Sequence, residues 1–173
     1  MNPTLRQADV DDARGIARVH VAAWRAAYRG QLPDDLLDNL SVDARTARWK
    51  KLLSDPSGGT RAFVAVDDGE VCGFVAFGRS RDADVDTRSV GEVFAIYVHP
   101  YAWRHGIGRA LLTIATNELE REGFDEATLW VLETNEPAKR FYESQGWEDD
   151  GGRKVDERPN ATFREMRYRV ALD

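Results

Sequence analysis

Cysteine is almost absent from this chain of 173 residues, in which Cys72 is the only one. A single cysteine excludes an intramolecular disulfide and a metal site built from cysteines, and it agrees with a reducing compartment. Long hydrophobic runs are absent too, because no apolar stretch approaches the roughly 20 residues of a membrane span. Residues 1–4 lead directly into structured sequence, so we expect no signal peptide and a cytoplasmic protein without a membrane partner.

Histidine and net positive charge are also scarce. The three histidines are dispersed and show no H-x-x-x-H spacing, so we predict no metal. The 24 lysines and arginines are outnumbered by 30 aspartates and glutamates, which gives a formal net charge of −6. Nonspecific nucleic-acid binding needs a basic face, so we expect no nucleic-acid partner. A mostly acidic surface suits a cationic substrate.

The chain shows no internal repeat, low-complexity segment or interdomain linker. Its length suits one domain with a full hydrophobic core. We therefore predict a single domain over residues 1–173.

The most informative stretch is 91–112, which predicts a buried strand, a polar turn and the start of a helix. A β-branched and aromatic run over 93–98 favours the strand, and apolar residues recur at helical spacing from Ile107 until Gly123. A helix that begins at such a turn presents unpaired N–H groups and the positive end of its dipole. Glycines at 106 and 108 would let a phosphate approach the backbone, so this turn predicts an anion site.

Two common nucleotide-binding patterns do not fit this turn. No Gly-Lys-Ser/Thr follows it, and Leu111 stands where the dinucleotide fingerprint needs a third glycine. The local positive charge that a polyanion requires is supplied by Arg104, His105 and Arg109. A phosphate site of another kind is therefore indicated.

A second motif covers 135–147. It predicts a helix with Asn135 as its cap, Pro137 in its first turn and Gly146 as its stop. Tyr142 lies on the apolar face of this helix, where a tyrosine is ordinarily part of the core.

Together the two motifs resemble the GNAT (Gcn5-related N-acetyltransferase) superfamily. Trp103–Gly108 corresponds to its Q/R-x-x-G-x-G/A turn, and 135–147 corresponds to N-x-x-A-x-x-x-Y-x-x-x-G-F/W, in the order that the family requires. Trp103 departs from the pattern, since the family usually has Gln or Arg there. The resemblance covers residues 60–150 well and the N-terminal third loosely.

The resemblance implies an α/β GNAT fold. Its sheet is mixed and mostly antiparallel, with about seven strands, splayed between the fourth and fifth, and it has helices on both faces. The expected strands are 4–8, 62–66, 71–77, 93–98, 127–132, 153–155 and 162–170. The expected helices are 11–28, 33–40, a segment from Ser41 that ends at 55–59, a central helix that ends at Gly123, and the helix of the second motif. The fourth and fifth strands should be parallel with a right-handed crossover.

The resemblance also implies acetyl-CoA as cosubstrate and an amine as acceptor. The predicted cofactor-binding residues are Ile96, Tyr97, Val98, Arg104, His105, Gly106, Ile107, Gly108, Arg109 and Asn135. The backbone of the first three would pair with the pantetheine amides, and the turn would hold the pyrophosphate. Trp24 and Tyr28 are candidates to line the acceptor groove, although both rings could simply pack on the sheet. Homodimers are common in the family, so a homodimer is a possible assembly.

Acetyl transfer needs a base for the ammonium proton and an acid for the departing thiolate. Glu92 is the candidate base, on a strand face that it should share with Phe94, Ile96 and Val98; otherwise it is a solvated carboxylate at the end of a strand. Tyr142 is the candidate acid. No nucleophilic Cys or Ser motif suggests an acyl-enzyme, so we expect direct attack in a ternary complex. The alternatives are a noncatalytic acyl-CoA-binding domain and a phosphate-ester or nucleotide enzyme.

Overall fold

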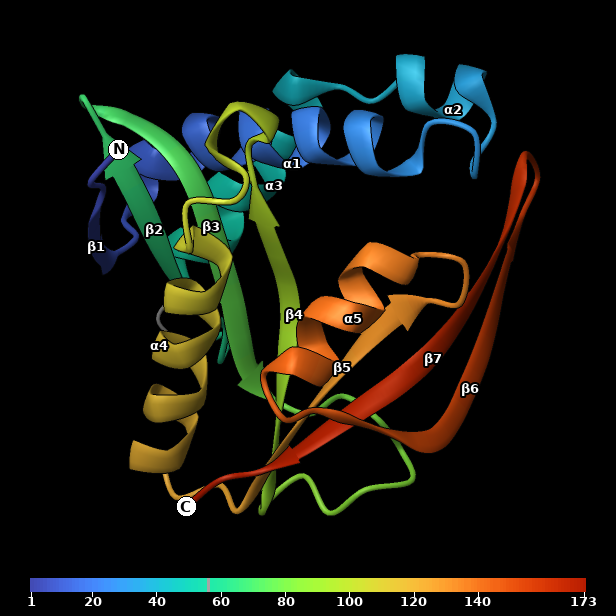
Figure 1. Cartoon of the computed structure of the whole chain (residues 1–173). Coiled ribbons are helices and arrows are strands. Elements are labelled where there is room, and N and C mark those ends of the chain that lie inside the picture. Colours follow the sequence, from blue (N-terminus) through green and yellow to red (C-terminus); the bar gives the residue numbers. More distant parts are fainter. Residues whose placement is uncertain (56) are drawn as a thin grey trace.

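The computed structural model describes residues 1–55 and 57–173, and it contains one seven-stranded sheet in the order β1-β2-β3-β4-β5-β7-β6 (Figure 1). The strands are β1 (Thr4–Gln7), β2 (Arg61–Asp67), β3 (Glu70–Arg79), β4 (Val90–Val98), β5 (Glu126–Leu132), β6 (Glu148–Arg158) and β7 (Ala161–Ala171). The α-helices are α1 (Ala13–Tyr28), α2 (Asp34–Asp38), α3 (Val42–Ser54), α4 (Ile107–Arg121) and α5 (Glu136–Ser144). Short 3-10 turns lie at Val10–Asp12 and Pro100–Ala102.

The sheet opens between β4 and β5. β4 pairs with β3 along its length, but its parallel pairing with β5 covers only Val90–Val93 against Glu126–Leu129. Residues 90–93 are buried, whereas each of residues 94–98 is partly exposed. The predicted parallel pair, the mixed sheet and the splay between the fourth and fifth strands are therefore confirmed (Figure 1).

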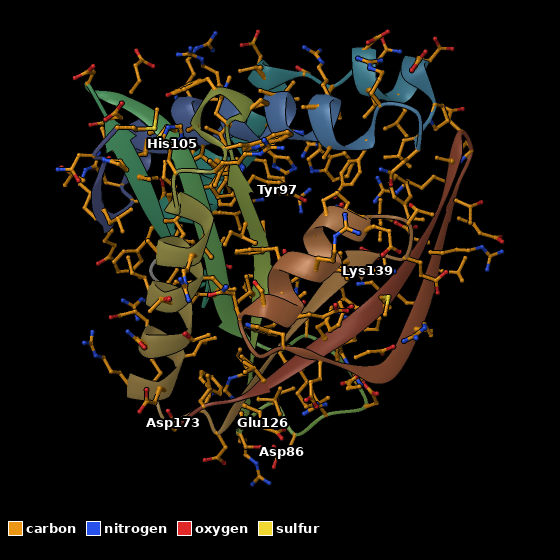
Figure 2. The ribbon with its side chains drawn as sticks, viewed as in Figure 1. Asp86, Tyr97, His105, Glu126, Lys139 and Asp173 are labelled. Carbon is orange, nitrogen blue, oxygen red and sulfur yellow. The ribbon has the colours of Figure 1, made fainter. Side chains whose placement is uncertain are left out.

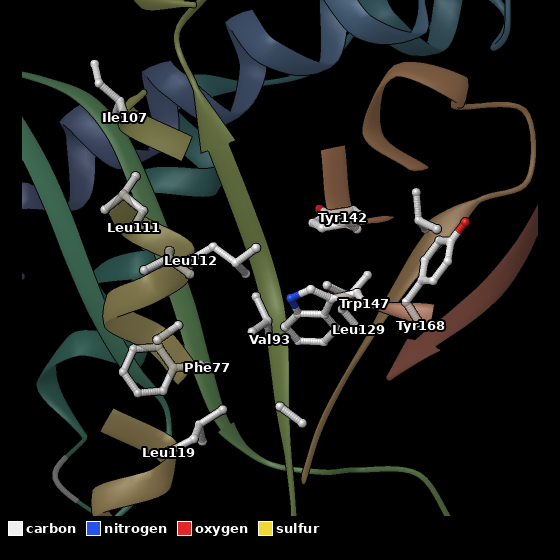
Figure 3. Close-up of a cluster of buried hydrophobic side chains, with 14 of the residues drawn as sticks. Phe77, Val93, Ile107, Leu111, Leu112, Leu119, Leu129, Tyr142, Trp147 and Tyr168 are labelled. Carbon is white, nitrogen blue, oxygen red and sulfur yellow. The ribbon is translucent and has the colours of Figure 1, made fainter. Parts of the chain in front are cut away.

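Helices cover both faces of the sheet, as predicted. One face carries α4 and α5, and its core includes Leu111, Leu112, Leu129, Tyr142 and Trp147 (Figure 3). The other face carries α1 and α3, and its core includes Ile16, Val19, Trp49, Val64 and Phe74. We call these the α4 face and the α1 face. Burial of these apolar side chains is the main force that holds the layers together.

A β-bulge in β4 changes which side chains share a face. The register passes from Ala76↔Ala95 to Phe77↔Val93, so Phe94 is the extra residue. Ahead of the bulge, a side chain at Gly91 would strike Leu119 of α4, so Glu92 points to the opposite face.

Beyond the bulge the alternation is reversed. Ile96 and Val98 pack in the α4 core, and Tyr97 packs with the α1 core. The expectation that Glu92 shares a face with Ile96 and Val98 is therefore wrong, because one inserted residue inverts the alternation.

Other boundaries differ from prediction in small ways. The N-terminal helix begins with a 3-10 turn capped by Asp9, and Ser41 caps α3 through a 3.0 Å bond from the Ala44 N–H. β6 spans eleven residues where only 153–155 were predicted. Pro56, which belongs to the predicted break at 55–59, lies outside the described residues.

Candidate functional site

The turn between β4 and α4 leaves a helix start without a side-chain cap. Gly106 is the N-cap residue, with a left-handed φ of 76° that favours glycine, and no side chain bonds to the first N–H groups of α4. Arg104 also has a positive φ of 67°. These amides and the helix dipole point toward the same space, which makes the turn suitable for an anion.

The side chains around this turn are basic. Arg104, His105 and Arg109 are exposed, and His105 lies at the end of the sheet where α4 begins (Figure 2). Within the described part of the chain, neither Arg104 nor Arg109 has a carboxylate within 4.0 Å, and Arg109 instead donates a 3.1 Å bond to Gln145 of α5. Both guanidinium groups are thus available to an anionic ligand.

Gly108 lies at the mouth of the opening between β4 and α5. A Cβ atom built there would lie 3.6 Å from the Phe141 ring and 3.8 Å from Val98, which is ordinary van der Waals contact. The absence of a side chain at this position keeps the passage between the α4 turn and α5 open.

The open edge of β4 presents alternate backbone groups. The N–H of His99 donates to the carbonyl of Cys72 on β3, so by alternation the backbone groups of Tyr97 also face β3. Those of Ile96 and Val98 therefore face the opening. Of the three residues predicted to pair with pantetheine, Ile96 and Val98 have backbone groups that point into the opening. The backbone of Tyr97 is paired with β3, and its side chain packs on the α1 face.

Trp103, the departure from the family pattern, has a defined contact. Its indole N–H donates a 2.7 Å hydrogen bond to the carbonyl of Val98. The ring, which is 43% exposed, therefore fastens the turn to the end of β4 and occupies one acceptor of the open edge. The N–H of Val98 still faces the opening.

On the opposite side of the opening, α5 contributes Asn135 and Tyr142. The Asn135 side chain caps the helix by accepting a 3.3 Å bond from the Ala138 N–H, as an ordinary cap would. Tyr142 is 9% exposed and packs near Trp147 and Tyr168 (Figure 3). Burial, and to a smaller extent the neighbouring Tyr97, raises the pKa of Tyr142 well above its usual range, so its hydroxyl keeps its proton.

Tyrosines from three elements gather at the opening. Tyr97 lies near the end of β4, close to α1 (Figure 2). The pKa of Tyr28 is raised well above its usual value, chiefly by burial and then by Tyr97 and Tyr142. The Asn135 side chain has the opposite, smaller effect and lowers the pKa of Tyr28. The structure thus brings Tyr28 of α1, Tyr142 and the α5 cap into one polar group around Tyr97.

The wall formed by α1 contains unpartnered polar atoms. His20 stacks on Tyr97 at 5.0 Å between ring centroids, and Trp24 packs edge-on against Tyr28 at 5.1 Å. Both ring nitrogens of His20 and the indole nitrogen of Trp24 are buried without a hydrogen-bond partner among the described residues. Burial lowers the pKa of His20 to about 3, with Arg45 and Arg48 adding to the effect, so the ring is neutral.

Glu92 is buried on the α1 face, with 2% of its surface exposed. Its carboxylate accepts a 3.0 Å bond from the backbone N–H of Arg81 and a 3.1 Å bond from the Arg81 guanidinium. The alternative of a solvated carboxylate at a strand end is therefore wrong. The same Arg81 guanidinium lies 4.1 Å above the Phe94 ring and covers this carboxylate.

The loop of residues 80–89 is held against β7 by ion pairs. Arg167 of β7 is bonded to Asp82, to Asp84 and to Asp150 of β6. Arg81, Arg45 and the side chain of Tyr97 were not predicted as site residues. Strand alternation could have pointed to Tyr97 only with the bulge known, and an isolated arginine on a polar helix carries no signal in a single sequence.

Three further findings concern the site and its surroundings. Among residues 1–55 and 57–173, no group of three or more His, Cys, Asp or Glu side chains is arranged to hold a metal ion. None of the helices in the same residues is long and apolar enough to cross a membrane. A surface hollow lined by Thr116, Gln145 and Leu172 lies along α4 and includes none of the predicted site residues.

A parallel strand pair that splays beside an uncapped helix start defines the class: this is an acetyltransferase fold. The chain belongs to the Acetyltransferase (GNAT) family, whose model it matches over residues 16–147. The family resemblance predicted from the two motifs is confirmed.

Individual relatives agree with this assignment. The chain is 38% identical over 144 residues to the uncharacterized N-acetyltransferase YuaI of Bacillus subtilis (strain 168), covering 82% of this chain and 78% of that protein. It is 33% identical over 141 residues to an uncharacterized N-acetyltransferase of Archaeoglobus fulgidus, covering 82% and 90%. The structure of yncA from Salmonella typhimurium with its cofactor acetyl-CoA has a TM-score of 0.72 at 24% identity, covering 100% of this chain and 95% of that one.

Proposed function

We propose that this protein is an acetyl-CoA-dependent N-acetyltransferase that acetylates a primary amine by direct attack in a ternary complex. The observation that carries the proposal is the open edge of β4, which lies between an uncapped helix start and the buried Tyr142. The amine belongs either to a small molecule or to a protein N-terminus or lysine. The named N-acetyltransferase relatives and the yncA complex with acetyl-CoA support the same reading.

In this proposal the turn holds the pyrophosphate. The N–H groups of Gly106 to Arg109 donate hydrogen bonds to its oxygens. The Arg104 guanidinium and the ring N–H of His105 donate further hydrogen bonds to it. Pantetheine follows the edge of β4 as an added strand, paired with the backbone of Ile96 and Val98, and passes Gly108 and Asn135. The thioester then lies beside the polar group around Tyr97.

The chemistry needs three groups. The N–H of Val98 polarises the acetyl carbonyl while the neutral amine attacks its carbon. The C–S bond breaks, and the thiolate of coenzyme A takes the proton of the Tyr142 hydroxyl. The nitrogen of the new amide releases its extra proton to solvent, and solvent restores the proton of Tyr142. The raised pKa keeps Tyr142 protonated at the start of each turnover.

Glu92 is the proposed acceptor of the ammonium proton, through a water molecule. It lies on the α1 face, which is the side from which the amine would pass Trp24 and Tyr28. Because Arg81 covers the carboxylate, the proposal requires the guanidinium to yield to the acceptor or to a water.

The bond between Arg81 and Glu92 favours a second candidate function, that of a noncatalytic acyl-CoA-binding domain. A carboxylate fixed by Arg81 would then have a structural role only. Release of free thiol separates the two: the enzyme releases coenzyme A only when a suitable amine is present, and a binding domain never does. Tyr142→Phe should lower this release while leaving acetyl-CoA binding unchanged.

A further inference from the structure

Arg45 of α3 is a partly buried cation without a carboxylate partner. Among the described residues it makes no ion pair and no hydrogen bond, although its guanidinium lies 5.5 Å above the Trp24 ring. Contact with a ring face leaves the five N–H donors of the guanidinium without acceptors. Arginine is almost never fully buried unless it is paired, and Arg45 is half-buried with no pair.

The surroundings of Arg45 increase the need for an anion. Arg48 follows one turn later on α3, and Arg158 approaches from the β6–β7 hairpin, which reaches the α1–α2 layer (Figure 1). Burial lowers the pKa of Arg45, and both arginines act in the same direction. Arg158 has its own partner in Asp156, at 2.9 Å, and lies 4.7 Å above the Phe163 ring.

Arg45, Arg48 and Arg158 lie near the residues that the acceptor amine is proposed to pass, Trp24 and Tyr97. The charges of Arg45 and of Glu165 on β7 both act on the pKa of Tyr97, in opposite directions, and Glu165 is paired with Lys154 at 3.6 Å. The Phe163 ring packs against the Trp24 ring, with 6.3 Å between the ring centroids. The rings of His20 and Trp24 lie 5.5 Å apart, and their nitrogens are buried without a hydrogen-bond partner among the described residues.

We propose that the acceptor is a small amine that also carries a carboxylate or phosphate group, which Arg45 binds. The guanidinium forms two parallel hydrogen bonds with such a group, and its planar shape suits this contact. The amine end of the molecule passes Tyr97 toward the thioester, with Glu165 near its positive charge. This inference rests on the proposed function, and it selects a small anionic amine over a protein lysine.

The inference departs from the expectation raised by net charge. A formal charge of −6 favours a cationic substrate at long range, but Arg45 lies over the Trp24 ring and Arg158 over the Phe163 ring, so the local charge here is positive. Close contacts outweigh the distant field, because exposed charges more than a Debye length of about 8 Å away are screened at physiological salt.

The test compares matched amines with the full-length protein, read out by free thiol. One pair sets common α-amino acids against their α-carboxamides, a second sets O-phosphoethanolamine against ethanolamine, and spermidine represents cations. We expect kcat/KM for either the α-amino acids or O-phosphoethanolamine to exceed kcat/KM for the matching neutral amine by about tenfold or more. Carboxamides have the more acidic ammonium and so more free amine, which means that chemistry alone would favour the opposite order.

Variants then assign the preference to Arg45. Arg45→Gln should remove the preference and raise KM for the anionic amine about tenfold, with KM for acetyl-CoA unchanged, and Arg45→Lys should retain part of it. Lys50→Gln removes the same charge from an exposed site on α3 and should change nothing. Equal use of neutral amines or spermidine, or an unchanged preference in Arg45→Gln, would overturn the inference alone. Thiol release only with peptide N-termini or peptide lysines would also overturn the inference alone, and no thiol release with either the small amines or such peptides would overturn the proposed function itself.

Discussion

The carboxylate of Glu92 and the guanidinium of Arg81 lie 3.1 Å apart, and the backbone N–H of Arg81 bonds to the other carboxylate oxygen. Only 3% of the Glu92 side chain is exposed, whereas 65% of the Arg81 side chain is. The buried partner is therefore fixed, and the exposed one is free to move. This asymmetry is what allows Glu92 to be tested as a base.

Glu92→Gln should lower kcat by about 10²-fold or more, the usual contribution of a positioned base. The amide keeps the shape of the side chain, so acetyl-CoA affinity measured by calorimetry should not change. Arg81→Gln is the matched control, because it leaves the carboxylate and its backbone bond in place and should keep most of the turnover. Wild-type kcat in Glu92→Gln would leave Glu92 a purely structural residue.

Tyr142→Phe and Tyr168→Phe should have opposite effects. The hydroxyl of Tyr142 has no hydrogen bond among the described residues, so its loss should change the free energy of unfolding by less than about 0.5 kcal/mol while kcat falls about 10²-fold. Tyr168 donates a 2.8 Å bond to Glu143, so its loss should cost about 1 kcal/mol and leave kcat unchanged. Urea unfolding and steady-state rates measure both; full activity in Tyr142→Phe would exclude it as the acid.

Stability should fall at high pH. Burial, followed by the contact with Glu143, raises the pKa of Tyr168 from 10.0 to about 12. The pKa values of Tyr28, Tyr97 and Tyr142 are raised as well. Below pH 10 both states keep these protons, so the stabilisation is complete. Between pH 10 and 12 the unfolded state loses protons that the folded state retains, so the free energy of unfolding should decline. Urea titrations at pH 8, 10 and 11 measure it, and a flat profile would contradict the burial of these hydroxyls.

Substitutions at Gly108 and Gly106 should separate ligand access from backbone strain. Gly108→Val places a Cβ no nearer than 3.6 Å to any neighbour, and its two methyl groups would occupy the passage that the Ala also found in the family turn leaves open. The fold should be unaffected while acetyl-CoA affinity falls about tenfold. Gly106→Ala meets a φ of 76° and should cost about 1–2 kcal/mol of stability. Calorimetry and thermal unfolding distinguish the two; unchanged affinity in Gly108→Val would place the ligand elsewhere.

Arg167 should be the most costly arginine to remove. Its side chain is 7% exposed and holds Asp82 and Asp150, which are themselves only 15% and 12% exposed. Arg167→Met leaves the Asp82 carboxylate without a cation, with only the Trp130 N–H bonded to it, whereas Asp150 keeps its 3.1 Å pair with Arg169. The loss should cost about 3 kcal/mol. Arg88→Gln breaks an exposed pair with Asp86 and should leave urea unfolding unchanged. Equal midpoints for the two variants would mean that the loop is not fastened through Arg167.

The parts of the fold that the sequence predicted were those with a periodic or motif signal. The apolar run of β4, the glycine turn and the α5 motif predicted the two sides of the opening and the parallel pair. β6 was mostly missed because it is an edge strand of polar residues, whose ladder to β7 depends on backbone hydrogen bonds rather than on apolar alternation.

The site was predictable only where backbone groups or motif residues form it. The bulge at Phe94 has no sequence signal, yet it decides that Tyr97 faces α1 while Ile96 and Val98 pack against α4. Arg81 and Arg45 reach their positions through a loop and a polar helix that variable tertiary contacts place. Local pattern does not encode such long-range contacts.

The central claim is that the α4 turn and the open edge of β4 bind acetyl-CoA, and isothermal titration calorimetry of the intact protein tests it directly. We predict one-to-one binding of acetyl-CoA. The affinity should fall in Gly108→Val and in an Arg104→Gln, Arg109→Gln double variant, and ATP should not displace the bound acetyl-CoA. No binding heat with acetyl-CoA, or displacement of acetyl-CoA by ATP at equal concentration, would contradict the account.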